Sequence, residues 1–487
     1  MSSKSMNRRE FLKAATLASA GTALAACTPK EVIVTKEVEK IVTQQVEVEK
    51  IVTQQVEVEV EKLVTAVPAK EKVKLNFFNR GGEYVFQTMD MQIAEFKKIH
   101  PEYEFELNSV AGYSHQEALL MMLAAGTGPD CWFDSVRTTG LLARKGVVEP
   151  LDDYLAANPD FKKENFTDNT FSCQTFDGKI WGIPWDSGAL LLFYNKNLFD
   201  KAGVAYPDPT KWITWDEIIA LSKQLTFDLN DKTPNDPGFD AARVRQYGFL
   251  ADTGHGRQTY MWSNGAEIIN ADMTMPIDTP EFTEAMNWLA DLGLKHYVAP
   301  SAKYQTAQEI TLASENVAME HGGIWSMGEW LDVGINLGMI QVPYSKKQTS
   351  YGQYSPMCVF TGSPSKEEAF TFIYFCTADP VGQKIIVDRG QLQPTLKSLR
   401  DPFLNGTPPP TKVERQLSYD VFENPDTYRW PGDKIGSYWG GWYQYFIDLW
   451  GPYLTDLFIG NKRWEDIAPE LRTKSESLLK TGEVPTA

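Results

Sequence analysis

Indole rings and carboxylates are close neighbours at several points of this 487-residue chain, which contains 14 tryptophans. Trp185 is followed by Asp186, and Trp132-Phe133 is followed by Asp134. An indole face can stack on the apolar C–H face of a polyhydroxylated ring, while a carboxylate accepts hydrogen bonds from its hydroxyl groups. These residue types are therefore suited to noncovalent recognition of a hydroxyl-rich molecule. Because indole faces also attract ammonium groups, a cationic solute is the alternative ligand.

Catalysis by the same carboxylates would be a different class of function. A glycoside hydrolase needs two carboxyl groups about 5–10 Å apart, and Asp134 and Asp186 are the candidates. The sequence has no serine elbow and no His-Glu-x-x-His helix, and its five histidines are scattered. We therefore expect a binding protein with no catalytic residues, no cofactor and no metal site.

The balance of charges excludes polyanionic partners. The formal net charge is −17, and because residues 1–26 carry +3 and residues 27–70 carry −2, the remaining residues carry −18. Phosphate backbones attract clusters of Lys and Arg and repel a body of this sign. The composition, 43% apolar and 23% charged, is typical of a folded soluble protein. Nucleic-acid binding is not expected.

The first 26 residues have the pattern of an export signal. The pair Arg8-Arg9 is followed, after Glu10, by Phe-Leu-Lys and then by an uncharged apolar run. This pattern resembles a twin-arginine signal. Asn7 stands where that motif usually has Ser or Thr, so the general export route stays open. The segment 24–27 (LAAC) resembles a bacterial lipobox, in which the thiol of Cys27 is acylated. We expect a lipid-anchored protein outside the cytoplasm that does not span the membrane.

Residues 27–70 predict a low-complexity tether. The decapeptide VEKIVTQQVE occurs at 38–47 and again at 48–57. At about 100° per residue, successive copies are about 80° out of phase on a helix, so no apolar stripe persists. A solvated stalk is favoured over a folded interaction module, and a coiled coil is not indicated. Whether the tether becomes ordered on meeting a partner stays open.

Four further cysteines lie in the body of the chain: Cys131, Cys173, Cys358 and Cys376. None of them forms the closely spaced pair that zinc sites use. Apolar neighbours, as in Cys131-Trp132-Phe133, are typical of buried free thiols, but an exported protein can also form a disulfide. The sequence leaves both possibilities open.

Strand and helix patterns alternate from residue 73 onwards. Residues 73–78 and 103–107 alternate as strands do, whereas 86–99 and 116–125 carry apolar residues at helical spacing. This alternation predicts an α/β fold whose sheet is parallel in part. The unbroken apolar run 190–194 is typical of a strand that is covered on both faces.

A series of blocks in the body resembles the extracellular solute-binding proteins of ABC importers, in particular the maltose-binding-protein-like sugar-binding family. The blocks, in family order over about residues 71–400, are AAGTGPD (124–130), GVVEPLDDYL (146–155), DGKIWGIPWDSGALLLFYNKNLFDKAGV (177–204), TWDEIIALSKQL (214–225), VAMEHGGIW (317–325) and KEEAFTFIYF (366–375). The resemblance implies a two-lobed α/β fold of the periplasmic-binding-protein type II, with mixed sheets and lobes joined by crossing hinge strands.

The resemblance also implies where the lobes divide. We expect residues 71–186 and 344–395 in an N-terminal lobe and residues 187–343 and 396–487 in a C-terminal lobe. The first crossing is placed near 184–189 and the second near 343–356. Ligand would bind in the cleft between the lobes, and the expected partner is an ABC permease in the membrane. The receptor is expected to be a monomer that captures a sugar or oligosaccharide, or alternatively a polyamine or peptide.

Residue patterns and the resemblance together nominate a set of ligand-binding residues. Trp325 stands where the family's cleft aromatic follows a strand, and Asp186 lies at the first crossing. The full set is Arg80, Glu83, Asp134, Trp185, Asp186, Trp262, Asn264, Gly323, Trp325, Tyr351 and Trp439.

Several members of this set have a structural alternative of similar weight. Asp134 could equally cap the helix that follows it, and Arg80 with Glu83 could form a surface ion pair. Asp186 could cap a local turn. Trp262 could pack behind the cleft, and Trp439 could pack between two helices.

Overall fold

The computed structural model describes residues 72–111, 115–301, 310–390, 392–430, 432–434 and 438–481. Residues 68–487 form one compact unit. The export signal, the lipobox and the tether predicted for residues 1–70 lie outside the described residues. Among the described helices, none has both the length and the apolar composition that a bilayer crossing requires.

The described residues form a ten-stranded mixed sheet and a separate two-stranded hairpin. The order in the large sheet is β2-β1-β3-β11-β6-β9-β8-β7, with β10 beside β6 and β12 beside β11. The strands are β1 (Val73–Gly81), β2 (Tyr103–Ala111), β3 (Cys131–Phe133), β4 (Thr175–Phe176), β5 (Lys179–Ile180), β6 (Ile183–Asn195), β7 (Phe227–Asp228), β8 (Val244–Leu250), β9 (Val317–Gly323), β10 (Leu337–Ile340), β11 (Ser350–Val359) and β12 (Tyr428–Arg429).

The helices begin and end where the sequence supplies caps. Thr214 and Thr411 each form a capping box with a glutamate three residues later, and Gly203 and Gly390 end helices in the left-handed conformation. The helices are α2 (Glu83–Ile99), α3 (His115–Ala124), α4 (Val136–Arg144), α5 (Asp152–Ala157), α6 (Lys196–Ala202), α7 (Trp215–Leu225), α8 (Gln258–Ser263), α9 (Pro280–Leu294), α10 (Met327–Asp332), α11 (Lys366–Thr377), α12 (Pro380–Arg389), α13 (Arg400–Leu404), α14 (Lys412–Glu423), α15 (Tyr438–Phe458) and α16 (Trp464–Thr481).

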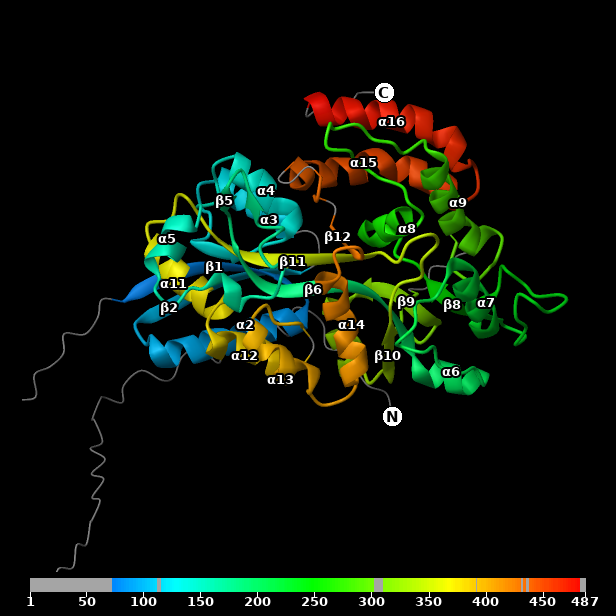
Figure 1. Ribbon diagram of the computed structural model, residues 1–487, viewed down its shortest axis with the longest axis horizontal. Helices are drawn as coiled ribbons and strands as arrows, with labels where there is room; N and C mark the ends of the chain where they lie inside the picture. The colour runs from blue at the N-terminus through cyan, green and yellow to red at the C-terminus, as the bar shows by residue number, and fades with distance from the viewer. Residues whose placement is uncertain are drawn as a thin grey trace, which may run out of the picture. The chain divides into compact units, whose positions relative to one another are not determined.

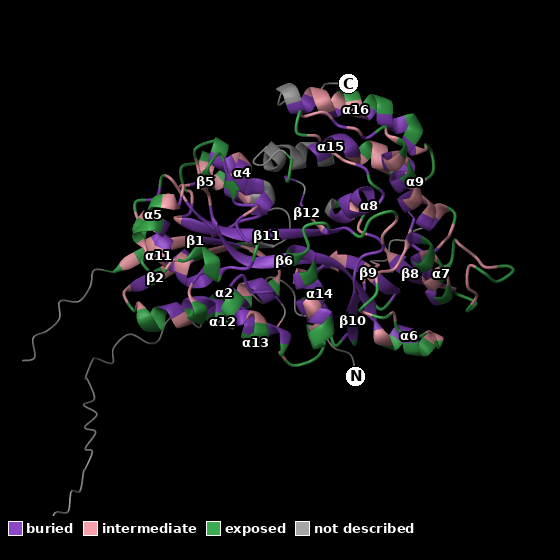
Figure 2. Cartoon of the chain, in the orientation of Figure 1, coloured by how far each residue is buried: buried purple, intermediate pink, exposed green. Residues whose placement is uncertain are grey.

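Strand β6 connects two parts of the large sheet. Its first half, 183–189, pairs antiparallel with β11, whereas its second half, 190–195, pairs antiparallel with β9 and β10. All 13 residues of β6 and all 10 of β11 are buried. Both strands are accordingly purple in Figure 2. In Figure 1, α2, α12 and α14 lie on one side of these two strands, and α4 and α8 lie on the other. The strand therefore changes neighbours between residues 189 and 190.

Most of the predicted elements are present with wider bounds. The strand expected at 73–78 extends through Gly81, and the helix expected at 86–99 begins at Glu83. The parallel pairing of β1 with β2 and β3, and of β8 with β9, confirms a sheet that is parallel in part. One detail differs: the run 190–194, expected as a strand, is the second half of a single strand that begins at Ile183 and includes Pro184, and its register against β11 shifts between Ser355 and Pro356. A bulge accommodates the proline without ending the strand.

The cysteines of the body are buried free thiols. Cys131, Cys173, Cys358 and Cys376 are all buried and unbridged. Burial in apolar surroundings disfavours the thiolate and raises the pKa of Cys173 to about 11. The sequence leaves open whether these cysteines are free thiols or form a disulfide, and in the structure all four are free thiols.

Candidate functional site

A cavity of about 380 Å³ opens where the carboxyl ends of β1 and β3 meet the middle of β6 and β11. In open α/β sheets, ligand groups gather at the carboxyl ends of parallel strands. The short helical turn at 324–326 and helix α10 close the opposite side. The lining residues are Arg80, Gly81, Gly82, Tyr84, Val85, His115, Phe133, Asp186, Trp325, Ser326, Glu329, Gln353 and Ser355.

Asp186 and Arg80 form the charged centre of the cavity. Asp186 is 5% exposed, and one of its carboxylate oxygens accepts a hydrogen bond from the backbone N–H of Ser355 at 3.3 Å. Burial raises the pKa of the Asp186 carboxyl to about 6, although the Arg80 guanidinium and the hydrogen bonds of Ser355 oppose the rise. Near neutral pH the cavity therefore presents a carboxylate that is close to its titration point.

Strand and ring contacts hold the Arg80 guanidinium in place. The guanidinium lies over the Phe133 ring, 4.4 Å from its centroid, and donates a hydrogen bond to the backbone oxygen of Asp134 at 2.6 Å. Both contacts come from the end of β3, beside β1. A guanidinium fixed in this way is oriented before ligand arrives, which lowers the entropy lost on binding.

Two glycines allow the Trp325 indole to lie against the sheet. A Cβ on Gly323 would stand 2.1 Å from the nearest ring carbon of Trp325, and a Cβ on Gly188 would stand 2.8 Å from the ring. Gly188 and Gly323 belong to β6 and β9, on either side of the point where β6 changes neighbours. The half-buried indole thus packs on bare backbone and contributes to the cavity wall. A flat apolar wall of this kind suits the C–H face of a ring.

Glu329 approaches the cavity from the opposite side. A Cβ on Gly82 would stand 2.2 Å from a carboxylate oxygen of Glu329, so the exposed Glu329 carboxylate lies against the backbone that begins helix α2. Gly82 is the N-cap of that 17-residue helix and offers no side chain to cap it. Negative charge is favourable beside a helix N-terminus, which explains the approach.

A second aromatic group adjoins the cavity through Trp325. Trp262 and Tyr351 are nearly parallel, with ring centroids 6.3 Å apart and an interplanar angle of 10°, and Trp325 packs beside them. The Arg429 guanidinium lies 4.8 Å from the centroid of the Trp262 ring and pairs with Glu267. Trp262 and Tyr351 do not line the cavity itself. They support the wall from behind.

Other nominated residues serve the framework. Asp134 is fully buried and accepts hydrogen bonds from the backbone N–H of Ser135 at 2.7 Å and the hydroxyl of Thr139 at 2.8 Å, both at the start of helix α4. Burial raises the pKa of its carboxyl. Trp185 is buried in the core and donates from its indole N–H to Gln92 at 2.8 Å.

Three further nominated residues lie away from the cavity or outside the description. Asn264 is buried and hydrogen-bonds to Glu281, Glu284 and Ser345. Glu83 is exposed and accepts a hydrogen bond from Gln87, one turn further along α2. Trp439 belongs to α15, but its side chain is outside the described part of the chain.

Sequence patterns alone do not nominate Glu329, Gln353, Ser355 or His115. Ser355 has an available signal, because it lies in the expected second crossing, and β11 sets it directly opposite Asp186. Gln353 is opposite Gly188 in the same register. Glu329 and His115 carry no local signal that separates them from surface residues. Within the described residues no group of acids, histidines and cysteines is arranged to hold a metal ion.

Comparisons with known proteins show what the chain is similar to. The sequence pattern of the family described as bacterial extracellular solute-binding protein matches residues 92–411. A putative binding protein of Brucella abortus is 25% identical over 379 residues, which cover 74% of this chain and 81% of that protein. The maltotriose-binding protein of Pyrococcus abyssi is 24% identical over 335 residues, covering 67% of this chain and 66% of that protein.

The fold is also present among solved structures. An ABC substrate-binding protein from Listeria monocytogenes, in complex with cycloalternan, superposes with a TM-score of 0.72 at 22% identity. The superposition covers 85% of this chain and 99% of that one. At this identity the similarity shows the two-lobed α/β fold.

Proposed function

This chain belongs to the bacterial extracellular solute-binding proteins, and from that premise we propose that it captures a carbohydrate in the cavity between β1, β6 and α10. The observation that carries the proposal is the Trp325 indole packed flat on Gly188 and Gly323, in the same cavity as the Asp186 carboxylate and the Arg80 guanidinium. The indole offers a face to the C–H groups, while Arg80 donates to ring oxygens and hydroxyls. The volume of about 380 Å³ is within the roughly 300–1,000 Å³ of small-molecule pockets.

Capture would proceed by closure of two lobes. We assign residues 71–186 and 344–395 to one lobe and residues 187–343 and 396–487 to the other, with β6 and β11 as the hinge strands. The change of neighbours within β6 and the approach of Glu329 to Gly82 support this division. A ligand stabilises a closed form only by contacts that are absent when the lobes are apart. Arg80 and Trp325 would supply such contacts from opposite lobes.

The cellular setting follows from the family and the first residues. Membership of an extracellular family places the protein outside the cytoplasm. We propose that a twin-arginine-like signal exports it, that acylated Cys27 anchors it to the membrane, and that residues 27–70 form the tether. The monomeric receptor would deliver its ligand to an ABC import permease. Mass spectrometry of the mature protein tests the anchor, because a Cys27→Ala variant would lose the acyl mass.

Calorimetric titration with separate sugar and polyamine panels tests the ligand class. We expect heat from a mono- or oligosaccharide, such as maltotriose, and none from amines, because an ammonium group has no acceptor to offer the Arg80 guanidinium that is fixed in the cavity. Binding of an amine with no response to any sugar would replace the carbohydrate proposal. The relatives are named as binding proteins, and we propose that this chain also leaves its ligand unchanged. Chromatography of the sugar after prolonged incubation would reveal new products if that were wrong.

A further inference from the structure

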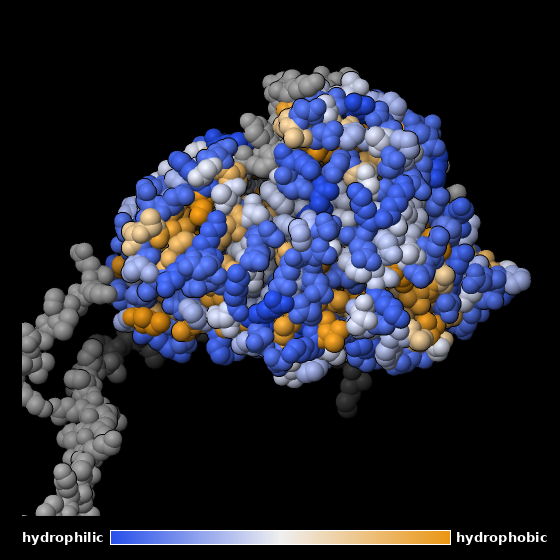
Figure 3. Space-filling model, in the orientation of Figure 1, coloured by the Kyte–Doolittle hydropathy of each residue, from blue (hydrophilic) through white to orange (hydrophobic). Residues whose placement is uncertain are grey.

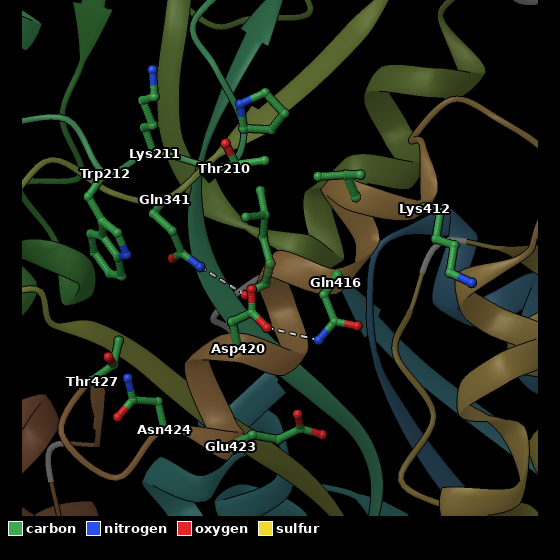
Figure 4. Close-up of a pocket in the computed structure, with 13 residues that line it drawn as sticks. Thr210, Lys211, Trp212, Gln341, Lys412, Gln416, Asp420, Glu423, Asn424 and Thr427 are labelled. Carbon is green, nitrogen blue, oxygen red and sulfur yellow. Dashed lines mark hydrogen bonds between the residues drawn. The ribbon is translucent and has the colours of Figure 1, made fainter.

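A second and larger cavity lies away from the candidate cleft, between helix α14 and the loop at 209–212. Its volume is about 690 Å³, and it shares no lining residue with the cavity that contains Asp186. Figure 4 shows the side chains of Trp212, Gln341 and Asp420 arranged around it. We propose that this cavity is a second binding site for an uncharged polyhydroxylated molecule.

The buried Gln341 amide provides the first polar contact. Gln341 is 3% exposed, and its amide nitrogen donates to the backbone oxygen of Leu417 at 3.0 Å. Its side-chain carbonyl oxygen is buried and accepts no hydrogen bond from the described residues. In Figure 4 that oxygen is turned toward the Trp212 side of the cavity. A buried acceptor without a donor carries a free-energy penalty, which a ligand hydroxyl would remove.

The Trp212 indole provides an apolar wall on a fixed segment. Trp212 meets the ring of Tyr344 edge-on, with centroids 6.1 Å apart. The segment that follows it pairs with the chain after β10, because Tyr344 donates its backbone N–H to Ile213 and accepts from Trp215. Trp212 and Gln341 are therefore held on adjoining backbone. Their spacing is set before any ligand binds, which favours binding.

Helix α14 supplies the carboxylate and is itself firmly anchored. One oxygen of Asp420 accepts from Gln416 at 2.8 Å, and the other accepts from none of the described residues. The helix is tied at its two ends, because Glu414 accepts from the backbone of Met339 and the Phe422 backbone oxygen accepts from Asn169. The carboxylate can thus receive a hydroxyl from a bound molecule without reorganisation of the helix.

The charges around the cavity favour a neutral ligand. Lys211 and Lys412 balance Asp420 and Glu423, so the lining carries no formal net charge. Lys211 pairs with Asp208, and Glu423 pairs with Arg400, so two of these charges are already compensated. The two charges that remain, on Lys412 and Asp420, are of opposite sign, so a strongly charged ligand would gain no net attraction from the lining. An indole, a carbonyl acceptor and a carboxylate acceptor together match the C–H face and hydroxyl edge of a sugar or polyol.

Fluorine NMR of protein labelled with 5-fluorotryptophan can observe the two cavities separately. The Trp212→Phe and Trp325→Phe variants assign the two resonances, and maltotriose and glucose are titrated through the millimolar range. We expect the Trp212 resonance to shift along its own saturation curve, and to do so unchanged in Trp325→Ala protein. Asp420→Asn should weaken that saturation about tenfold, since a ligand hydroxyl then donates to a neutral amide oxygen in place of a charged carboxylate. Asp388→Asn, an exposed aspartate on α12, is the matched control and should have no effect.

Two results would overturn the second site. The Trp212 resonance could stay unmoved by both sugars, or it could follow the Trp325 curve and cease to move in the Trp325→Ala protein. In the latter case Trp212 would report only on events in the cleft. Failure of the second site leaves the function proposed for the cleft untouched, because the Trp325 resonance tests that function independently.

Discussion

At the scale of single residues, Trp325 is the side chain on which affinity should depend most. Its indole is half-buried against Gly188 and Gly323 and makes up an apolar wall of the cavity. Trp325→Ala should therefore weaken ligand binding by more than about 1 kcal/mol, as for a buried aromatic anchor, without unfolding the protein. Calorimetry and circular dichroism on variant and parent measure the two effects. Trp181→Ala, which removes an indole outside the cavity, serves as the control. Equal affinities for Trp325→Ala and the parent would contradict the prediction and show that Trp325 serves only in packing.

Asp186 makes a prediction about pH. Its carboxyl pKa is raised to about 6 by burial, so the group gains charge as pH increases through that value. Ligand hydroxyls that donate to the carboxylate stabilise its charged form and lower the pKa on binding. Affinity should consequently increase from about pH 5 to about pH 7, with release of protons near pH 6. Titration in buffers of different ionisation enthalpy measures the protons released. A flat pH profile, or one that persists in Asp186→Asn, contradicts this role.

Burial of the Asp186 carboxyl also makes the stability of the fold depend on pH, and stability falls over the range in which affinity should rise. An aspartate in the unfolded chain ionises near its ordinary value of 3.8, whereas Asp186 in the folded protein retains its proton to about pH 6. Between these values folding takes up a proton, so Asp186 lowers the stability of the fold as pH rises through that window. A site that needs this carboxylate for binding thus bears a stability penalty at the pH where it binds best.

Residue types and their neighbours predict part of the cavity lining. Arg80, Asp186 and Trp325 are nominated by their neighbours and by the family resemblance, and all three line the cavity. Asp134 shows the limit, since a carboxylate directly after a strand has the same sequence whether it faces ligand or caps the next helix. In the structure its two carboxylate oxygens accept from Ser135 and Thr139, and Asp134 does not line the cavity.

At the scale of elements, Gln92 joins helix α2 to strand β6 and helix α12. Its fully buried amide accepts from the Trp185 indole at 2.8 Å and donates to the backbone oxygen of Gly382 at 2.9 Å. Gln92→Leu would leave both groups buried without this partner. We expect a loss of about 2–4 kcal/mol in the free energy of unfolding, measured by urea denaturation. Gln87→Leu, at an exposed position on the same helix, should change it by under about 0.5 kcal/mol, and similar losses in both variants would contradict the role of Gln92.

The backbone of β6 should control the position of Trp325. A methyl group on Gly188 would stand 2.8 Å from two ring carbons of that indole, so one of them must move. Gly188→Ala is expected to lower affinity by about 1 kcal/mol or more, because the displaced ring narrows the cavity. The control is Gly451→Ala on α15, where an added Cβ meets nothing within 4 Å. Calorimetry measures the affinity of both variants for ligand. Unchanged affinity in Gly188→Ala would show that the Trp325 ring can move aside without narrowing the cavity.

Hydrophobic periodicity predicts individual helices and strands better than it predicts which of them contact one another. The helical spacing of Met89, Ile93, Phe96 and Ile99 indicates the buried face of α2 correctly for the first three, whereas Ile99, at the end of the helix, is 55% exposed. No local pattern could bring Glu329 to Gly82, because that approach depends on how β9 and α10 follow the second half of β6. Such contacts depend on long-range pairing between strands, which the hydrophobic pattern of a single segment does not predict.

At the scale of the whole molecule, the chain has a strong net negative charge and at least one largely hydrophilic face (Figure 3). The face shown in Figure 3 is mainly hydrophilic, with apolar residues in scattered patches. Residues 71–487 carry the chain's net negative charge, and the segment before Cys27 is net positive. A body of this sign is repelled by anionic lipid headgroups, so the tether and acyl chain that we propose would hold it near the membrane without drawing it onto the surface.

Closure of the proposed lobes makes a prediction about distance. Met121 on α3 and Val333 after α10 are 67% and 63% exposed, and they belong to opposite lobes in our assignment. Spin labels on Met121→Cys and Val333→Cys should move closer when ligand saturates the protein, because closure brings the two walls of the cavity together. The described cysteines are buried, so with Cys27→Ala the labels react at the engineered sites.

A second labelled pair separates closure from general compaction. Met91 on α2 is 45% exposed and shares the expected N-terminal lobe with Met121, so the distance between Met91→Cys and Met121→Cys should not change with ligand. If both pairs shorten, the whole protein contracts and no hinge at β6 and β11 is needed. If neither changes while calorimetry reports binding, the cavity accepts ligand as a rigid site. Shortening of the first pair alone is the result that requires β6 and β11 to bend, since they are the strands that join the two assigned lobes.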